Sequence, residues 1–313
     1  MPNFIKPDVN NKLFKELLKQ RPLWWQNLLN DKELYINIRQ DNHINVYYHG
    51  GSLLNLEYTN SFKAKIHFEY IPLTKYENND YVPLYFDSYG NIQFPEIKTI
   101  KLDNFNINAL NAIKKRISHF YGPSSEKGIQ ASFVLNTENG GFIDTEFQPV
   151  SNRKIRFDMV WVDVILKKIF FIELKTIEDA RLVFSPDIVN SNNTKDNIYK
   201  QIKKYHEFIE QNKQDITEYY QNIFEIEKNL DILPEKLRTT ESLKGFAVET
   251  KPILLVGNCT LSWIKENKNT ERINNALKDI AFGCFYQGKA TREFRVPEKS
   301  EGYKYVFNKI GVR

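Results

Sequence analysis

The stretch Phe170-Phe171-Ile172-Glu173-Leu174-Lys175 decides how this chain is read. Its apolar run predicts a buried strand, and that strand ends in a carboxylate and a lysine two residues apart. Because successive side chains of a strand point to opposite faces, Glu173 and Lys175 project to the same side. Unpaired buried charges are costly, so the two residues are expected to act together.

A second predicted strand, Ile155-Arg156-Phe157-Asp158-Met159-Val160-Trp161-Val162, precedes this one and carries Asp158 near its start. The short connection between the strands predicts a two-residue turn at Lys167-Lys168, which sets Val162 opposite Glu173. Asp158 then lies on the same surface as the Glu-x-Lys pair. Two carboxylates and a lysine on one face indicate a site for a hard divalent cation and the water that it activates.

A predicted helix further along the chain contains Gln201-Ile202-Lys203-Lys204-Tyr205, and Glu126 lies at the start of an earlier one. Together with Asp158 and the Glu-x-Lys strand, these residues resemble the PD-(D/E)XK nuclease superfamily and the Gln-x-x-x-Tyr signature of its RecB-like members. The resemblance covers roughly residues 108 to 257. One departure is Phe157, which stands where many members have a proline before the aspartate.

The resemblance implies an α/β fold, namely a restriction-endonuclease-like core of order αβββαβ with a central mixed sheet flanked by helices. It also implies a Mg²⁺ cofactor, with Mn²⁺ as a substitute. Asp158, Glu173, the backbone carbonyl of Leu174 and, at the edge, Glu126 would hold the ion. Lys175 would orient or help deprotonate the attacking water, and Gln201 would complete the set of catalytic residues.

Composition restricts the other function classes. The 313 residues include 44 basic and 39 acidic side chains, and a net charge of +5 permits a nucleic-acid partner without requiring one. Two cysteines and five scattered histidines provide no zinc cluster, and there is no phosphate-binding Gly-x-x-x-x-Gly-Lys motif. With no secretion signal and no apolar run of membrane-helix length, a cytoplasmic location without membrane contact is expected.

Two domains are expected, residues 1–105 and residues 106–313. In the first, two helices should meet at Pro22, an antiparallel meander should follow to about residue 73, and residues 74–104 should be irregular. In the second we expect helices over 107–120, 125–135 and 270–282, a helix capped by Asp196, and strands near 141–147 and 251–257. A loop over 180–195 and a basic tail with Lys289, Arg292, Arg295 and Lys299 complete it.

Several residues have competing interpretations. Glu126 is explained equally by the helix dipole and by a metal site, and Glu146 competes with it as the third carboxylate. Gln201 either contacts the site or is an ordinary hydrogen-bonding amide, while Tyr205 is expected to pack. Asp163 should point away from Glu173. Outside the site, a solvated helix face is favoured over phosphate contact for Lys114-Lys115-Arg116, and core packing over base stacking for Tyr47-Tyr48-His49.

The function expected from these features is that of a magnesium-dependent phosphodiesterase that cuts nucleic acid, with DNA favoured over RNA and an endonuclease favoured over an exonuclease. Restriction or antiphage defence is ranked before repair, because the chain has its own additional β-rich domain and no ATPase motif. The alternative is a nuclease-fold DNA-binding protein, or a component that a partner protein licenses and that is inert alone. A homodimer is compatible with either function.

Overall fold

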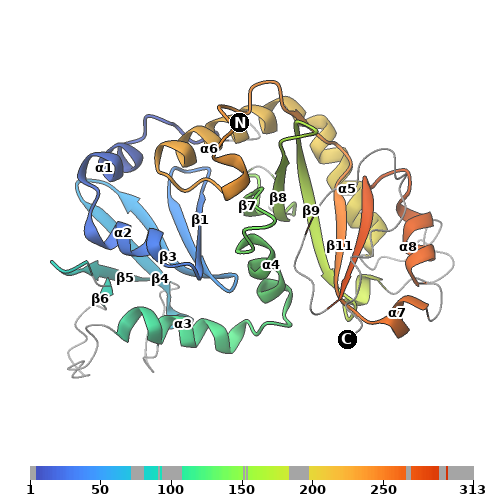
Figure 1. Ribbon diagram of the computed structural model, residues 1–313, viewed down its shortest axis with the longest axis horizontal. Coiled ribbons are helices and arrows are strands. Elements are labelled where there is room, and N and C mark those ends of the chain that lie inside the picture. Colours follow the sequence, from blue (N-terminus) through green and yellow to red (C-terminus); the bar gives the residue numbers. More distant parts are fainter. Residues whose placement is uncertain are drawn as a thin grey trace. The chain divides into compact units, whose positions relative to one another are not determined.

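The computed structural model describes residues 5–71, 81–90, 92–93, 108–150, 152, 154–182, 197–265, 269–288 and 294. Over these residues the protein is a mixed α/β structure with two sheets and eight α-helices (Figure 1). Contacts divide it into two compact units. The mixed-sheet unit comprises the described residues of Ser124–Gln221 and Pro234–Arg313, and the meander unit those of Ile5–Pro123 and Asn222–Leu233.

The meander unit confirms the two predicted N-terminal helices and the antiparallel meander. Its strands follow one another in the sheet in chain order, each antiparallel to the next. Its elements are α1 (Lys12–Gln20), α2 (Leu23–Asn30), β1 (Leu34–Ile38), β2 (Ile44–Tyr48), β3 (Gly51–Tyr58), β4 (Phe62–His67), β5 (Tyr81–Phe86), β6 (Ile92–Gln93) and α3 (Asn108–Phe120).

The expectation of an irregular segment over 74–104 is wrong for the part that the structure describes, since β5 and β6 extend the sheet there. In β5 the side chains of Val82 and Leu84 are buried, whereas Tyr81 and Tyr85 are exposed, which is the period of two of a half-buried strand. Pro83 inside the strand and the polar residues on either side of it obscured that pattern. The predicted domain boundary at residues 105 and 106 lies outside the described residues, and α3 falls in the meander unit.

The mixed-sheet unit is built on a sheet of order β12-β11-β9-β8-β7, with the short β10 paired to β9. β7, β8 and β9 are antiparallel neighbours, and β11 and β12 continue the sheet in parallel with β9. Its elements are α4 (Glu126–Val134), β7 (Phe142–Phe147), β8 (Phe157–Asp163), β9 (Lys168–Thr176), α5 (Ile198–Gln211), the first part of α6 (Lys213–Asn229), β10 (Ala247–Val248), β11 (Ile253–Cys259), α7 (Leu261–Lys265), α8 (Asn269–Leu277) and β12 (Gly283–Gly288).

The pairing of β8 with β9 corrects the predicted register by four residues. Val162 lies opposite Ile169 rather than Glu173, and Asp163 lies opposite Lys168 rather than Ile172. The connection is therefore not a two-residue turn at Lys167-Lys168. Asp163 Oδ1 accepts hydrogen bonds from the backbone N–H groups of residues 165 and 166, both at 2.8 Å, and stabilises a longer turn. Because four is an even number, every residue keeps its predicted face of the sheet.

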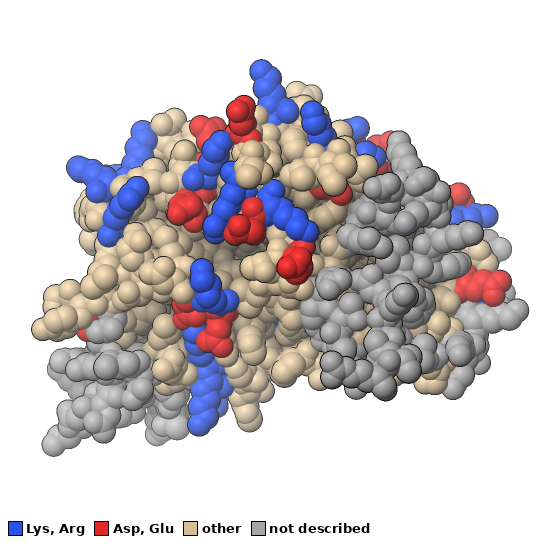
Figure 2. All heavy atoms as spheres, in the orientation of Figure 1, with Lys and Arg blue, Asp and Glu red and all other residues tan. Residues whose placement is uncertain are grey.

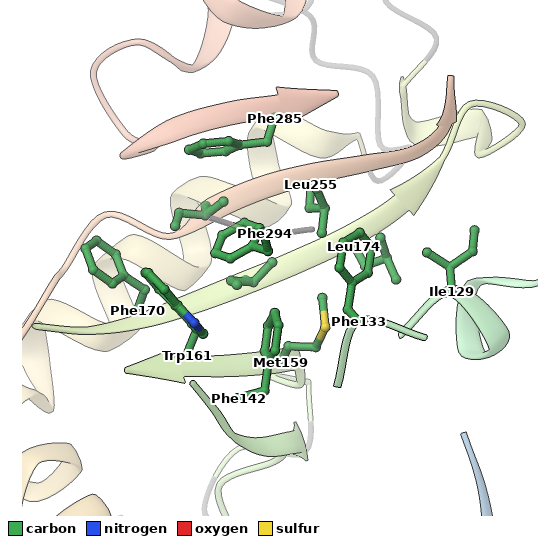
Figure 3. Packing of buried hydrophobic residues seen from close by; sticks show 12 residues of the cluster. Ile129, Phe133, Phe142, Met159, Trp161, Phe170, Leu174, Leu255, Phe285 and Phe294 are labelled. Atoms are coloured by element: carbon green, nitrogen blue, oxygen red, sulfur yellow. The ribbon is translucent and has the colours of Figure 1, made fainter. Parts of the chain in front are cut away.

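Apolar side chains cover both faces of this sheet, which explains why its central strands are nearly continuous apolar runs. On one face, residues of α4 pack on the strands (Figure 3): Ile129, Phe133, Phe142, Met159, Trp161, Phe170, Ile172, Leu174, Ile253, Leu255, Phe285 and Phe294. On the other face, residues of α5 and α8 do so, and this cluster contains Leu182, Ile198, Ile202, Leu254, Val256, Cys259, Ile273, Leu277, Ala281 and Tyr286.

Two segments of this unit differ from expectation. β12 occupies residues just after the predicted 270–282 helix, which ends at Leu277. The helix that carries Gln201 is capped by Asn197, whose side chain accepts from the Lys200 N–H at 2.9 Å. The predicted cap, Asp196, and the basic tail with Lys289, Arg292, Arg295 and Lys299 lie outside the described residues. No helix in the described part of the chain is long and apolar enough to cross a membrane.

The packing of the mixed sheet predicts a large effect of truncating Leu255, which is fully buried at its centre. Leu255→Ala should lower the free energy of unfolding by about 2–5 kcal/mol, because it removes buried methyl groups and leaves a cavity. Urea denaturation of the purified variant measures this. Ile165→Ala is the control, because that side chain is 88% exposed and its loss should change stability by less than about 0.5 kcal/mol. Equal effects of the two substitutions would contradict the assigned core.

Candidate functional site

The charged residues predicted from the sequence meet at the carboxyl end of β9. Glu173 and Lys175 are each 1% exposed, and Asp158, near the start of β8, is also buried. The backbone N–H of Leu174 donates to Asp158 Oδ2 at 2.7 Å, so the aspartate side chain ties the two strands together. The structure therefore brings Asp158, Glu173 and Lys175 together, as the shared face required.

The ammonium group of Lys175 lies among the oxygens that the resemblance nominates as metal ligands. It contacts Glu173 Oε1 and donates to the backbone carbonyl of Leu174 at 2.6 Å. Glu126 Oε2 lies 3.6 Å and Asp158 Oδ2 3.9 Å from the same nitrogen. We call these four residues and Leu174 the acid cluster. These oxygens lie around the Lys175 ammonium, which is the cation of the acid cluster in this structure.

Glu126 forms the solvent-facing edge of the acid cluster, with a side chain that is 35% exposed. It opens α4, where the Ser125 hydroxyl caps the helix by accepting from the Gly128 N–H at 3.0 Å. Burial and the neighbouring charge of Asp158 raise the pKa of Glu126, although Lys175 opposes them. Glu126 thus lies in the first turn of a helix, as the dipole explanation expects, and also beside Lys175, so that its part in a metal site stays a prediction.

Gln201 on α5 contacts the acid cluster directly. Its amide Nε2 donates to Glu173 Oε1 at 2.5 Å and to the Tyr205 hydroxyl at 3.0 Å. The Tyr205 hydroxyl in turn donates to the backbone carbonyl of Arg156 at 2.6 Å, and its ring packs on Phe157 with centroids 4.5 Å apart. The Gln-x-x-x-Tyr pair therefore fixes one oxygen of Glu173, and Tyr205 has polar partners as well as the packing role expected for it.

Arg181 is a neighbour of the site that the sequence analysis missed. Its guanidinium forms a two-point contact with Asp179, with Nε–Oδ1 at 2.9 Å and Nη2–Oδ2 at 2.6 Å. A third nitrogen donates to Gln201 Oε1 at 3.4 Å. The only sequence signal is an Asp-x-Arg pair shortly after the Glu-x-Lys strand, and such pairs are too common to be noticed alone.

Glu146, the competitor for the third carboxylate, is held by other partners. Its carboxylate contacts Lys127 Nζ, lies 3.2 Å from Arg156 Nε and accepts from Gln130 Nε2 at 3.0 Å. Burial alone would raise the pKa of Glu146, but the two cations and this hydrogen bond outweigh it and lower the pKa. The structure thus places Glu126, not Glu146, beside Lys175.

The remaining alternatives are resolved by burial. Tyr47 and Tyr48 are buried in the meander unit, so the packing interpretation is confirmed for them. The expectation of a solvated face is wrong for Lys114, which is buried and forms ion pairs with Asp31 at 2.5 Å and Glu33 at 2.7 Å. As expected, Asp163 does not join the acid cluster, because its carboxylate stabilises the β8–β9 turn.

The electrostatics of the acid cluster are those of a site with too few cations. Burial raises the pKa of Asp158, although the charge of Lys175 opposes it. Burial and then the charge of Asp158 raise the pKa of Glu173 well above its usual value, again against the effect of Lys175. Burial acts to lower the pKa of Lys175, but the attraction of Glu173, Asp158 and Glu126 outweighs it and the net shift is upward. Lys175 is therefore an ammonium ion at neutral pH, and it faces three carboxylates. One additional cation would compensate the excess of negative charge.

The donor set fits a hard divalent cation of the Mg²⁺ type. Glu173 Oε2 is buried and has no hydrogen-bond partner in the structure, so a carboxylate oxygen remains for a ligand. No three acidic, histidine or cysteine side chains within the described ranges form a ready metal-binding group. Mg²⁺ does not need one, because it is usually held by one or two carboxylates with water and substrate oxygens completing the shell. Asp158, Glu173 and the Leu174 carbonyl meet that requirement.

Comparison with known proteins does not assign the chain to a family. No family model matches it, and neither a curated protein nor a solved structure shows significant similarity.

The raised pKa of Glu173 predicts a pH-dependent stability difference between the wild type and Glu173→Gln in EDTA. A carboxyl whose pKa is raised by folding stabilises the protein below its unfolded pKa, about 4.3 for glutamate, and this stabilisation is lost as the pH rises through the folded value. The amide carries no charge at any pH. The melting temperature of Glu173→Gln should therefore increase relative to that of the wild type between acidic and neutral pH. If the melting temperatures of the two proteins instead change with pH in parallel, burial does not penalise the charge of Glu173.

Proposed function

We propose that this chain is a metal-dependent nuclease of the PD-(D/E)XK type that hydrolyses phosphodiester bonds of DNA. The observation that carries the proposal is the convergence of Asp158, Glu173 and Glu126 on Lys175, with Glu173 Oε2 buried and unpartnered. The order α4, β7, β8, β9, α5, β11 supports it, since it reproduces the αβββαβ succession expected for such a core, with α6 and β10 inserted before β11.

In this proposal Asp158, Glu173 and the Leu174 carbonyl hold Mg²⁺ or Mn²⁺, and Glu126 completes the site from its exposed edge. These are the oxygen ligands that hard cations prefer. When bound, such an ion lowers the pKa of a coordinated water and offsets negative charge on the phosphate. Gln201 and Tyr205 act on Glu173, because their hydrogen bonds hold Oε1 in place and leave Oε2 as the ligand atom.

The role proposed for Lys175 is electrostatic. Its raised pKa keeps the amine protonated at neutral pH, so in this state it donates hydrogen bonds and cannot accept a proton from water. A fixed ammonium beside the reacting phosphate stabilises the charge that develops in the transition state. Of the two roles expected for this residue, orienting the water fits a protonated amine better than removing a proton, and stabilising the phosphate is a further role of the same charge.

The biological setting that we propose is restriction or antiphage defence. The support is the meander unit, a separate β-rich unit that could select a substrate or dock a partner. A protein that binds nucleic acid without cutting it, or cuts only when a partner is bound, is the alternative that the following assay distinguishes.

Incubation of the purified chain with supercoiled, linear and single-stranded DNA and with RNA, in Mg²⁺, Mn²⁺ or EDTA, tests the activity. Asp158→Asn, Glu173→Gln and Lys175→Ala should each reduce cleavage by at least about 100-fold, since each removes a charge at the reacting centre. Asp163→Asn is the matched control: it changes an acid on the same strand that stays outside the cluster, and it should cut normally. Full activity in any of the three site variants would refute the assignment.

Metal binding provides a readout that does not depend on cleavage. Free Mg²⁺ at 100 times its dissociation constant should stabilise the wild type against urea by about 2.7 kcal/mol. Asp158→Asn and Glu173→Gln should lose most of that stabilisation, and Asp163→Asn should keep it. Stabilisation without cleavage would favour the partner-licensed alternative, whereas the absence of both would argue against a metal site.

A further inference from the structure

A second group of charged residues adjoins the acid cluster and carries a net positive charge. Lys127, on the first turn of α4, and Arg156, just before β8, both contact the carboxylate of Glu146. We call Lys127 and Arg156 the basic pair. Two cations share one carboxylate, so the group retains an excess of positive charge.

The backbone at Glu146 is unusual in a way that favours a specific role. Its φ of 55° lies in the left-handed region, although the residue is not glycine and belongs to strand β7. Such a conformation is strained and persists only where the surrounding structure enforces it, often at functional sites. Here it accompanies a carboxylate that is largely buried between Lys127, Arg156 and Gln130.

Short connections join the basic pair to the acid cluster. The Gln130 amide donates both to Glu146 and to the backbone carbonyl of Asp158. Arg156 precedes Asp158 by two residues, and its own carbonyl accepts from Tyr205, which also contacts Gln201. Lys127 follows Glu126 directly. The basic pair is thus fixed relative to the proposed metal ligands, and the charge of Asp158 acts on Arg156.

Arg156 has the exposure that a ligand contact requires. Its side chain is 56% exposed, and its contact with Glu146 uses Nε, which leaves the terminal nitrogens uncommitted to that carboxylate. A guanidinium edge matches two oxygens of a phosphate group, and a lysine beside it contributes a point charge. A purely structural ion pair of such an exposed arginine would contribute little stability.

The geometry points to Arg156 and Lys127 as a binding subsite for a backbone phosphate of the nucleic acid, with Glu146 as the residue that positions them. This inference rests on the proposed function, because it takes the ligand to be the strand cut at the acid cluster. Over the described residues on the viewed face, Figure 2 shows basic and acidic side chains intermixed, which favours a local subsite over a uniformly basic surface.

The test measures binding without cleavage. Fluorescence anisotropy in EDTA gives the affinity of the full chain for a labelled DNA duplex at several salt concentrations. Each phosphate contact contributes about 0.9 to the slope of log affinity against log salt, because bound counterions are released. Arg156→Gln and Lys127→Gln should each reduce the steepness by about that amount. Arg156→Lys should keep the slope but bind more weakly, since it retains the charge and loses the planar fork.

Arg238→Gln is the matched control, since it removes one positive charge elsewhere in the same unit, where Arg238 pairs with Glu235. It should leave the slope unchanged. If Arg156→Gln and Lys127→Gln behave like this control while the wild type binds and cuts DNA, the subsite is overturned and the nuclease proposal stands. If the wild type binds no DNA at any salt concentration and cuts none with metal, the proposed function fails together with the subsite.

Discussion

The constraint on which the mixed-sheet unit depends is the burial of an ammonium ion among carboxylates at the end of β9. Removing charges from water is expensive, and their attraction compensates this only where the geometry is good and the remaining hydrogen bonds are made. Several elements supply that geometry. β8 brings Asp158 to the Leu174 N–H, α4 brings Glu126, and α5 brings the amide that binds Glu173. The two apolar clusters fix those elements on opposite faces of the sheet, so the core determines where the charges meet.

Even so, the charges around Lys175 are not fully compensated, and this is the physical reason for proposing that the acid cluster is functional. A site selected for stability alone would not keep three buried or half-buried carboxylates around one lysine, nor leave Glu173 Oε2 without a partner. Proteins tolerate such local costs where the chemistry requires them. Burial and then the neighbouring charge of Asp158 raise the pKa of the Glu173 carboxyl, although Lys175 opposes them. One more cation would offset that charge and would give the unpartnered oxygen a ligand.

The sequence was sufficient to place Asp158, Glu173 and Lys175 on one face of the sheet, because face alternation has a period of two. The predicted register of β8 against β9 was wrong by four residues, yet Asp158, Glu173 and Lys175 remained on one side. An error of one residue would have separated them. What the sequence could not supply depends on long-range contacts. Strand β5 was hidden by Pro83 and by the polar residues that flank the strand. Arg181 could be connected to the site only through its contact with Gln201. Nothing in the sequence predicts the left-handed backbone conformation of Glu146.

Gln130 shows how two clusters of opposite sign can coexist side by side. It is almost fully buried, and its neutral amide bridges Glu146 and the Asp158 carbonyl. A lysine there would bring another cation towards Asp158 and compete for the place of the proposed metal ion. A glutamate would repel Glu146 and draw Lys127 and Arg156 away from the surface. An amide can donate to both acceptors without adding charge. The acid cluster therefore keeps its excess of negative charge, and the basic pair keeps its excess of positive charge. The negative excess would attract a metal ion and the positive excess a phosphate, so a phosphodiester could bind the basic pair by its charge and the metal ion by its oxygens.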